Sequence, residues 1–281
     1  MTCAISFGSS VPGGELGTRI LSAVVLIPIA LAAAYFGGPL WAAFWFIAAC
    51  LVFWEWMSLI GTSRTIMVTA VGFLGYAAAA ACLLAGLLGW GVATLTLGLI
   101  GSVLLTHKDR PLWTAGGFLY GAALLLSPVV LRRDPEFGLL AVVFLFGIVW
   151  TSDIAAYFVG RTVGGPKIWA RVSPKKTISG ALGGTFAAVL IALAIAHVGG
   201  LGSIAALALV ALVLSVVSQA GDFLESAIKR RFSVKDASQL IPGHGGLMDR
   251  LDGFITASFL AVLIGVARGG FDQAGRGLLH W

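Results

Sequence analysis

Long apolar intervals without a charged side chain constrain this chain more than any other feature. Ile20–Trp54 holds 35 residues without a charge, Thr65–Thr106 holds 42 and Thr177–Gly221 holds 45. A helix crosses about 30 Å of hydrocarbon with roughly 20 residues, so each interval is long enough for two crossings. Only 11% of the 281 residues are charged, whereas soluble domains carry about 25%. We therefore expect an all-α polytopic integral membrane protein.

Glycine-rich breaks divide these three intervals into pairs of spans. The breaks are Gly37–Pro39, Gly86–Gly91 and Gly199–Gly200. Shorter charge-poor intervals predict one further span each: Pro111–Leu131, Phe137–Val159 and Gly253–Ala267. The total is about nine transmembrane helices, and the last interval, with 15 residues, is the shortest.

The basic residues test this count, because Lys and Arg accumulate in cytoplasmic loops. With nine spans, fourteen of the 18 Lys and Arg residues fall on the side of the N-terminus and four on the other. We therefore expect a multi-pass membrane protein with a cytoplasmic N-terminus, and we assign it to the plasma (cell inner) membrane. Its loops Gly160–Lys176 and Asp222–Asp252 carry most of the polar chemistry, so the cytoplasmic face is the expected site.

Other readings of the composition fail. The net charge of +6 does not indicate nucleic-acid binding, because a basic binding face requires a soluble surface. The cysteines Cys3, Cys50 and Cys82 lie far apart, without the spacing of a disulfide framework or a zinc site.

Ionisable residues are densest between Ser218 and Asp252. The segment continues an apolar run, so we expect its first part to be helical. Asp222, Glu225, Ser226 and Lys229 then follow the spacing of one helix face. Charged groups at the end of a span are costly unless they are paired, hydrated or bound to metal, and they indicate a functional site.

A glycine-rich loop and two aspartates complete this segment. Pro242–Gly246 contains three glycines, which let backbone amides approach a phosphate closely. Asp249 and Asp252 follow at helical spacing and, with Asp222, offer the oxygen ligands that Mg²⁺ prefers. Alone, the two aspartates would more often form a salt-bridged helix cap with Arg250. The nearby basic cluster alone would more often contact anionic lipid. The combination favours phosphoryl or nucleotidyl transfer.

The string from Ser226 to Asp252 resembles the signature of the CDP-diacylglycerol synthase (phosphatidate cytidylyltransferase) family. It reads Ser226-x-x-Lys229-Arg230, Lys235-Asp236, Pro242-Gly243-His244-Gly245-Gly246 and Asp249-Arg250-x-Asp252. Three further segments are similar to other parts of that family: Trp54–Trp56, Asp153–Arg161 and Ser173–Thr177. One departure is Ser179, where the family usually has a carboxylate.

The resemblance implies that a cytidylyl group passes from CTP to phosphatidic acid, giving CDP-diacylglycerol and pyrophosphate for phospholipid biosynthesis. It implies Mg²⁺, with K⁺ as a candidate second cation, and a homodimer among membrane lipids. The domains expected are an N-terminal cytoplasmic segment, 1–18, and one transmembrane catalytic domain, 19–281. Within the latter, the N-terminal spans cover about 20–131 and the catalytic spans and loops about 137–268.

The site residues fall into three groups. The catalytic candidates are Asp222, Asp249, Lys229, Ser226 and Asp252, and the metal candidates among them are Asp222, Asp249 and Asp252. The substrate-binding candidates are Arg230, Lys235, Asp236, His244, Gly245, Gly246, Arg250, Asp153, Lys175 and Lys176.

Alternative roles stay open for some of these residues. His244 either donates to a phosphate or braces the glycine loop, and Lys175 and Lys176 are either ligands or solvated surface residues. Glu55 is either a hydrogen-bond acceptor within the bundle, which we favour, or a contact at the lipid entrance.

Two other functions compete with the synthase. A CTP-dependent polyprenol or phytol kinase shares the nucleotide and the membrane, but its neutral acceptor needs fewer cations than this chain provides. A polytopic transporter also carries carboxylates within its spans, but its site usually lies near the bilayer midplane. Here the carboxylates cluster at one face.

Overall fold

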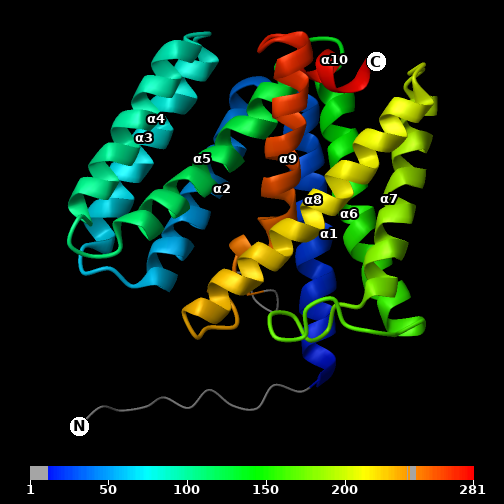
Figure 1. Ribbon diagram of the computed structural model, residues 1–281. Helices are drawn as coiled ribbons and strands as arrows, with labels where there is room; N and C mark the ends of the chain where they lie inside the picture. Colours follow the sequence, from blue (N-terminus) through cyan, green and yellow to red (C-terminus); the bar gives the residue numbers. More distant parts are fainter. Residues whose placement is uncertain (1–11, 239, 241–244) are drawn as a thin grey trace.

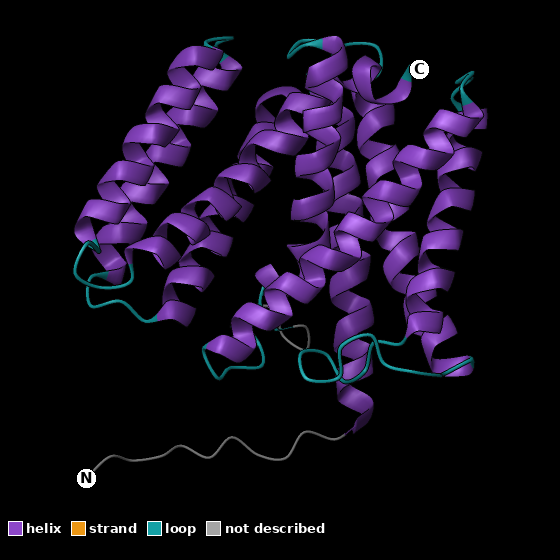
Figure 2. Ribbon diagram, viewed as in Figure 1, coloured by secondary structure: helices purple, strands orange, loops and turns teal. Residues whose placement is uncertain are grey.

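The protein is a bundle of long helices (Figures 1 and 2). The computed structural model describes residues 12–238, 240 and 245–281, with side chains from residue 24 onward, and these residues form no β-strand. The helices are α1 (Pro12–Phe36), α2 (Gly38–Ile60), α3 (Thr65–Leu84), α4 (Leu88–Leu105), α5 (Pro111–Arg132), α6 (Gly138–Thr162), α7 (Ile178–Val198), α8 (Ile204–Arg231), α9 (Met248–Gly269) and α10 (Ala274–Leu279).

The predicted crossings each correspond to one long helix. Over the described parts of the chain, the eight helices α2 to α9 are long and apolar enough to span a membrane. α1 contributes a shorter apolar stretch, Val24–Phe36. The expectation of an all-α polytopic membrane protein is thereby confirmed.

The boundaries of the last span differ from those expected. α9 has 22 residues and begins at Met248, so it is longer than the charge-free interval Gly253–Ala267, and Asp249, Arg250 and Asp252 lie in its first turns, as the helical spacing of the two aspartates predicted. The charge-free interval underestimated the span, because these three side chains line a polar cavity instead of facing lipid. The short C-terminal helix α10 was not expected; Gly277 of α10 accepts a hydrogen bond from Arg268 of α9 at 2.6 Å.

The bundle centre is built from α2, α5, α6 and α9, where large aromatic side chains interlock. Trp45 of α2 stacks on Phe254 of α9 with ring centroids 4.9 Å apart, and Phe254 also contacts Phe146 of α6. Trp41 donates its indole N–H to the carbonyl of Pro128 in α5 at 2.8 Å, because a buried indole needs an acceptor. α3 and α4 form a hairpin beside this centre (Figure 1).

α8 is the helix that brings charge to the end of the bundle. Its 28 residues span about 42 Å at 1.5 Å per residue, more than the hydrocarbon thickness. It lies inclined across the bundle, and its last turns reach the end at which α1 begins (Figure 1). That end, here called the basic end, also carries the α6–α7 loop (163–177) and the α8–α9 loop (232–247).

The positive-inside argument predicts that the basic end is cytoplasmic. In a variant without its native cysteines, we expect Lys175→Cys and Lys235→Cys to react with a membrane-impermeant maleimide only after cells are opened. Gly202→Cys, in the exposed α7–α8 turn at the other end, serves as the control and should react in intact cells. Labelling of positions 175 and 235 in intact cells would contradict this orientation.

Candidate active site

A cavity of about 1000 Å³ opens at the basic end of the bundle, among the ends of α6, α7, α8 and α9 and the α6–α7 loop. Both signs of charge line it. The acidic lining residues are Asp153, Asp222, Asp236, Asp249 and Asp252, and the basic ones are Arg161, Lys167, Lys175, Lys176, Lys229 and Arg250. Nine of the residues proposed from the sequence therefore meet in one cavity, although they come from segments up to 99 positions apart.

A close crossing of α8 and α9 brings the aspartates of the two helices together. A Cβ on Gly221 would lie 2.8 Å from the carbonyl oxygen of Asp252, and one on Gly253 would lie 2.5 Å from the hydroxyl of Ser218. Only glycine leaves room for backbones this close. Asp222 directly follows one of these glycines and Asp252 directly precedes the other, so the crossing point fixes where both carboxylates enter the cavity.

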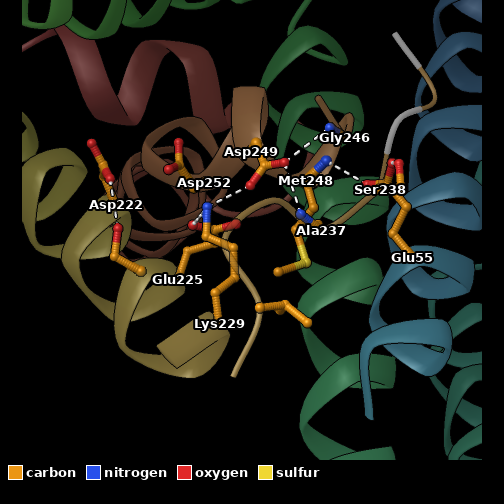
Figure 3. A network of polar contacts seen from close by, with 12 residues as sticks. Glu55, Asp222, Glu225, Lys229, Ala237, Ser238, Gly246, Met248, Asp249 and Asp252 are labelled. Carbon is orange, nitrogen blue, oxygen red and sulfur yellow. Dashed lines mark hydrogen bonds and ion pairs between the residues drawn. The ribbon is translucent and has the colours of Figure 1, made fainter. Parts of the chain in front are cut away.

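Lys229 lies between two carboxylates near this helix crossing (Figure 3). Its ammonium nitrogen lies 2.7 Å from Oε2 of Glu225 and 2.5 Å from Oδ1 of Asp249. The Glu225 contact is an ion pair without hydrogen-bond alignment, and neither Glu225 oxygen has a hydrogen-bond partner among the described residues. The side chain of Glu225 is 1% exposed, so Lys229 supplies the positive charge that its burial requires.

Asp249 also holds the α8–α9 loop. Its Oδ2 atom accepts hydrogen bonds from the backbone N–H of Ala237 at 3.0 Å and of Gly246 at 2.9 Å. With Lys229 on Oδ1, both carboxylate oxygens are engaged by protein groups. The same aspartate therefore links α8, α9 and both ends of the connecting loop.

Glu55 anchors the loop from the opposite side (Figure 3). This fully buried α2 residue accepts from the hydroxyl of Ser238 at 2.5 Å and from the backbone N–H groups of Leu247 at 2.9 Å and Met248 at 2.7 Å. The first N–H groups of a helix lack partners within it, and an anion is stabilised there. The interpretation of Glu55 as an acceptor within the bundle is confirmed.

Gly245 and Gly246, the last residues of the glycine-rich segment, fit tightly beside these two carboxylates. A Cβ on Gly246 would lie 2.9 Å from Oε1 of Glu55 and 3.1 Å from Oδ2 of Asp249. Gly245 has φ +83°, a conformation that residues with a side chain rarely adopt. Both glycines thus serve the clamp on the loop, and neither lines the cavity. His244 lies outside the described residues.

Lys176 closes the other side of the cavity. It forms an ion pair with Asp222, and its ammonium nitrogen lies 4.5 Å from the centre of the Phe223 ring. The Asp222 carboxylate is also 3.5 Å from the hydroxyl of Ser226, one turn along α8. The α6–α7 loop is therefore tied to α8 at the carboxylate that the sequence placed at the site.

Comparison with known proteins shows which family has this sequence. The chain matches the cytidylyltransferase family over residues 17–267. The chain belongs to the cytidylyltransferase family. It is 41% identical over 256 residues to the phosphatidate cytidylyltransferase of Brucella suis biovar 1 (strain 1330), covering 89% of this chain and 93% of the relative.

Other relatives match a shorter stretch. The phosphatidate cytidylyltransferase of Bacillus subtilis (strain 168) is 36% identical over 128 residues, which is 45% of this chain and 48% of that protein. The enzyme of that name from Staphylococcus aureus (strain COL) is 41% identical over 119 residues, 42% of this chain and 46% of the relative. The sequence resemblance to the synthase family is confirmed.

The predicted metal site of this cytidylyltransferase is only partly assembled by protein groups. Asp153, Asp222 and Asp252 line one cavity with oxygen donors, and Mg²⁺ is commonly held by one or two carboxylates together with substrate phosphates. These residues therefore fit a magnesium ion, and phosphate oxygens of the substrates would supply its remaining ligands. Within the described ranges, no three acidic, histidine or cysteine side chains form a metal-binding group. The joint ligation by Asp222, Asp249 and Asp252 stays a prediction.

Two proposed phosphate-binding residues lie apart from the cavity. Arg230 and Lys235 are exposed and do not line it, and Arg230 donates to the carbonyl of Val234 at 3.3 Å. Conversely, Arg161 and Lys167 line the cavity without having been proposed as site residues. Glu225 was placed on the charged face of this helix but given no role at the site, although its position four residues before Lys229 was a signal for an ion pair.

We expect Lys229→Met to destabilise this cytidylyltransferase by about 3–5 kcal/mol, because it leaves buried carboxylates without their cation. Adding Glu225→Gln should recover part of that loss, because the second change removes one of the two charges. Unfolding of the purified protein in mixed micelles with sodium dodecyl sulfate measures both effects. Arg230→Met is the neighbouring control and should change stability by less than about 0.5 kcal/mol.

A lower stability of the double variant than of Lys229→Met would contradict the assigned pairing. It would mean that other contacts of the Glu225 carboxylate stabilise the fold by more free energy than its unpaired charge costs.

A second expectation concerns the clamp by Glu55. Glu55→Ala leaves two backbone N–H groups and one hydroxyl without an acceptor, at a cost of about 3 kcal/mol. We expect faster tryptic cleavage after the exposed Lys235, with cleavage after the exposed Arg171 in the α6–α7 loop as the internal reference. Ser238→Ala removes one donor and should have a smaller effect. Equal cleavage rates in Glu55→Ala and the unmodified protein would show that Glu55 does not hold the loop.

Proposed function

We propose that this protein transfers a cytidylyl group from CTP to phosphatidic acid, forming CDP-diacylglycerol and pyrophosphate. The observation that carries the proposal is the cavity at the end of the bundle, where carboxylates and cations meet beside the membrane-spanning helices. Family membership and the 41% identity to a phosphatidate cytidylyltransferase over most of both chains support it.

The charges of the cavity suit two anionic substrates. Six basic and five acidic side chains line it, a net of one positive charge. CTP and phosphatidic acid together bring several negative charges, so lysines and arginines alone do not neutralise them. A kinase for a neutral alcohol would need to hold only one polyanion. When bound, Mg²⁺ supplies the remaining positive charge at the phosphate oxygens.

The reaction requires no covalent intermediate with the protein and little proton transfer by it. An oxygen of the phosphatidic acid phosphate attacks the α-phosphorus of CTP, a new P–O bond forms, and the bond to the β-phosphate breaks to release pyrophosphate. That attacking phosphate is ionised near neutral pH, so no side chain has to remove a proton from it. Catalysis then depends on position and electrostatics.

The chain's own residues divide these tasks by their places in the cavity. Asp222 and Asp252, at the α8–α9 crossing, would hold Mg²⁺, with Asp249 as the third predicted ligand. Lys176, which contacts Asp222 and reaches in from the α6–α7 loop, would bind a substrate phosphate. Lys229 would keep Asp249 and Glu225 in place while stabilising the departing pyrophosphate. K⁺ is the candidate for a second cation.

The cellular setting is proposed on the same grounds. CTP is dissolved in the cytoplasm and phosphatidic acid stays in the bilayer, so a cavity at a span end serves both. We infer a cytoplasmic basic end, a place in the plasma (cell inner) membrane and, from the resemblance, a homodimer.

The purified protein should form a CMP-bearing lipid from labelled CTP and phosphatidic acid when Mg²⁺ is present. Chelation of the metal should abolish the product and added Mg²⁺ should restore it. Asp222→Asn and Asp249→Asn should each lower kcat at least about 100-fold, because the first removes a charge from the predicted metal site and the second also weakens the hold on Lys229 and the α8–α9 loop. Thin-layer chromatography of the labelled lipid gives the readout.

Asp272→Asn is the matched control, because Asp272 is 84% exposed and pairs with Arg133 rather than lining the cavity. Its activity should equal that of the unmodified protein. Formation of CDP and a phosphorylated alcohol would instead support the kinase.

A further inference from the structure

An apolar groove runs between α7 and α8 next to the polar cavity. Its volume is about 490 Å³, and it is lined by Leu182, Thr185, Phe186 and Val189 of α7 and by Leu212 and Val216 of α8. Phe186 is 67% exposed and Val216 is 51% exposed, so the groove faces the surface that lipid covers. α7 and α8 meet at their turn and diverge towards the basic end, where the cavity lies (Figure 1).

The lining changes character in steps along these two helices. At the basic end, Lys176 and Asp222 carry charge. One turn further, Gln219 of α8 donates its amide N–H to the hydroxyl of Thr185 in α7 at 2.9 Å and lies 3.3 Å from the carbonyl of Ala181. Gln219 and Ala181 line the cavity, whereas Thr185 lines the groove. The two spaces therefore border each other at this uncharged polar contact.

The order of these groups matches the order of groups in one lipid molecule. Phosphatidic acid has a charged phosphate, then uncharged ester groups, then acyl chains. On α8, the corresponding positions are Asp222, Gln219 and the pair Val216 and Leu212. Leu212 lies ten residues before Asp222, about 15 Å along the helix, far enough to follow a headgroup and the start of an acyl chain.

We propose that the α7–α8 groove binds an acyl chain of the phosphatidic acid whose phosphate occupies the cavity, and that this lipid enters laterally between α7 and α8. The inference rests on the proposed function for the identity of the lipid. Its support is that the groove borders a charged cavity at the Gln219–Thr185 contact, a neighbour that a groove filled by arbitrary bilayer lipid would not require.

Photolabelling tests the groove independently of turnover. Phosphatidic acid with a diazirine on one acyl chain should label residues 182–189 and 212–216, as mapped by peptide mass spectrometry. Unlabelled dioleoyl phosphatidic acid should remove this labelling, and dioleoyl phosphatidylcholine should not. Labelling spread evenly over exposed helices, or equally removed by phosphatidylcholine, would overturn the inference.

Val216→Trp gives the kinetic test, because the indole fills the groove without touching the charged residues. The KM for dioleoyl phosphatidic acid should rise about tenfold, the effect of losing contact with roughly two methylene groups. The KM values for CTP and for dihexanoyl phosphatidic acid should change less than about twofold by the same argument. Leu97→Trp on α4, at a position that is 68% exposed and outside the groove, is the control.

The outcomes separate the two proposals. Competed labelling of the groove without any lipid product would leave the groove inference standing and reject the reaction. Equal changes for long and short chains in Val216→Trp would reject the acyl-chain site. A change in oligomeric state of Val216→Trp, measured by light scattering in detergent, would assign the groove to contact between copies of the chain and also reject it.

Discussion

The need to compensate buried negative charge governs the basic end of this protein. Glu55, Glu225 and Asp249 are carboxylates with little or no exposure, and in such surroundings each must find donors or a cation. The donors come from different parts of the chain: one lysine, one hydroxyl and four backbone N–H groups. Meeting these requirements ties α2, α8, α9 and the α8–α9 loop into one unit.

This arrangement distinguishes carboxylates that hold the loop in place from carboxylates that only line the cavity. Asp249 and Glu55 have their oxygens engaged by Lys229, the α8–α9 loop and the start of α9, whereas Asp222 and Asp252 enter the cavity from the glycine crossing. The signature string from Ser226 to Asp252 therefore mixes two kinds of requirement. Some of its members shape the loop, as Gly246 does, and others line the space that substrates would fill.

The sequence was sufficient for the class of fold and for the location of the site. Charge-free intervals predicted α1 to α9, because the cost of placing charge in hydrocarbon makes such intervals long and easy to find. The same argument misplaced the start of α9, since Asp249 and Asp252 avoid lipid by facing a cavity. It also left Glu55 ambiguous, because its partners Leu247 and Met248 lie more than 190 positions away. Such a contact depends on how helices pack, which hydropathy does not encode.

α8 has a mechanical consequence beyond the groups it carries. This one continuous helix lines the α7–α8 groove at Leu212 and Val216 and crosses α9 at Gly221. Beyond the crossing it lines the charged cavity at Asp222 and Lys229. A helix is stiff over this length, so a small rotation of α8 about Gly221 would displace Val216 on one side of the crossing and Lys229 on the other, while Asp222 would stay near the pivot. Binding in the groove and binding in the cavity would then be coupled through the inclination of one helix.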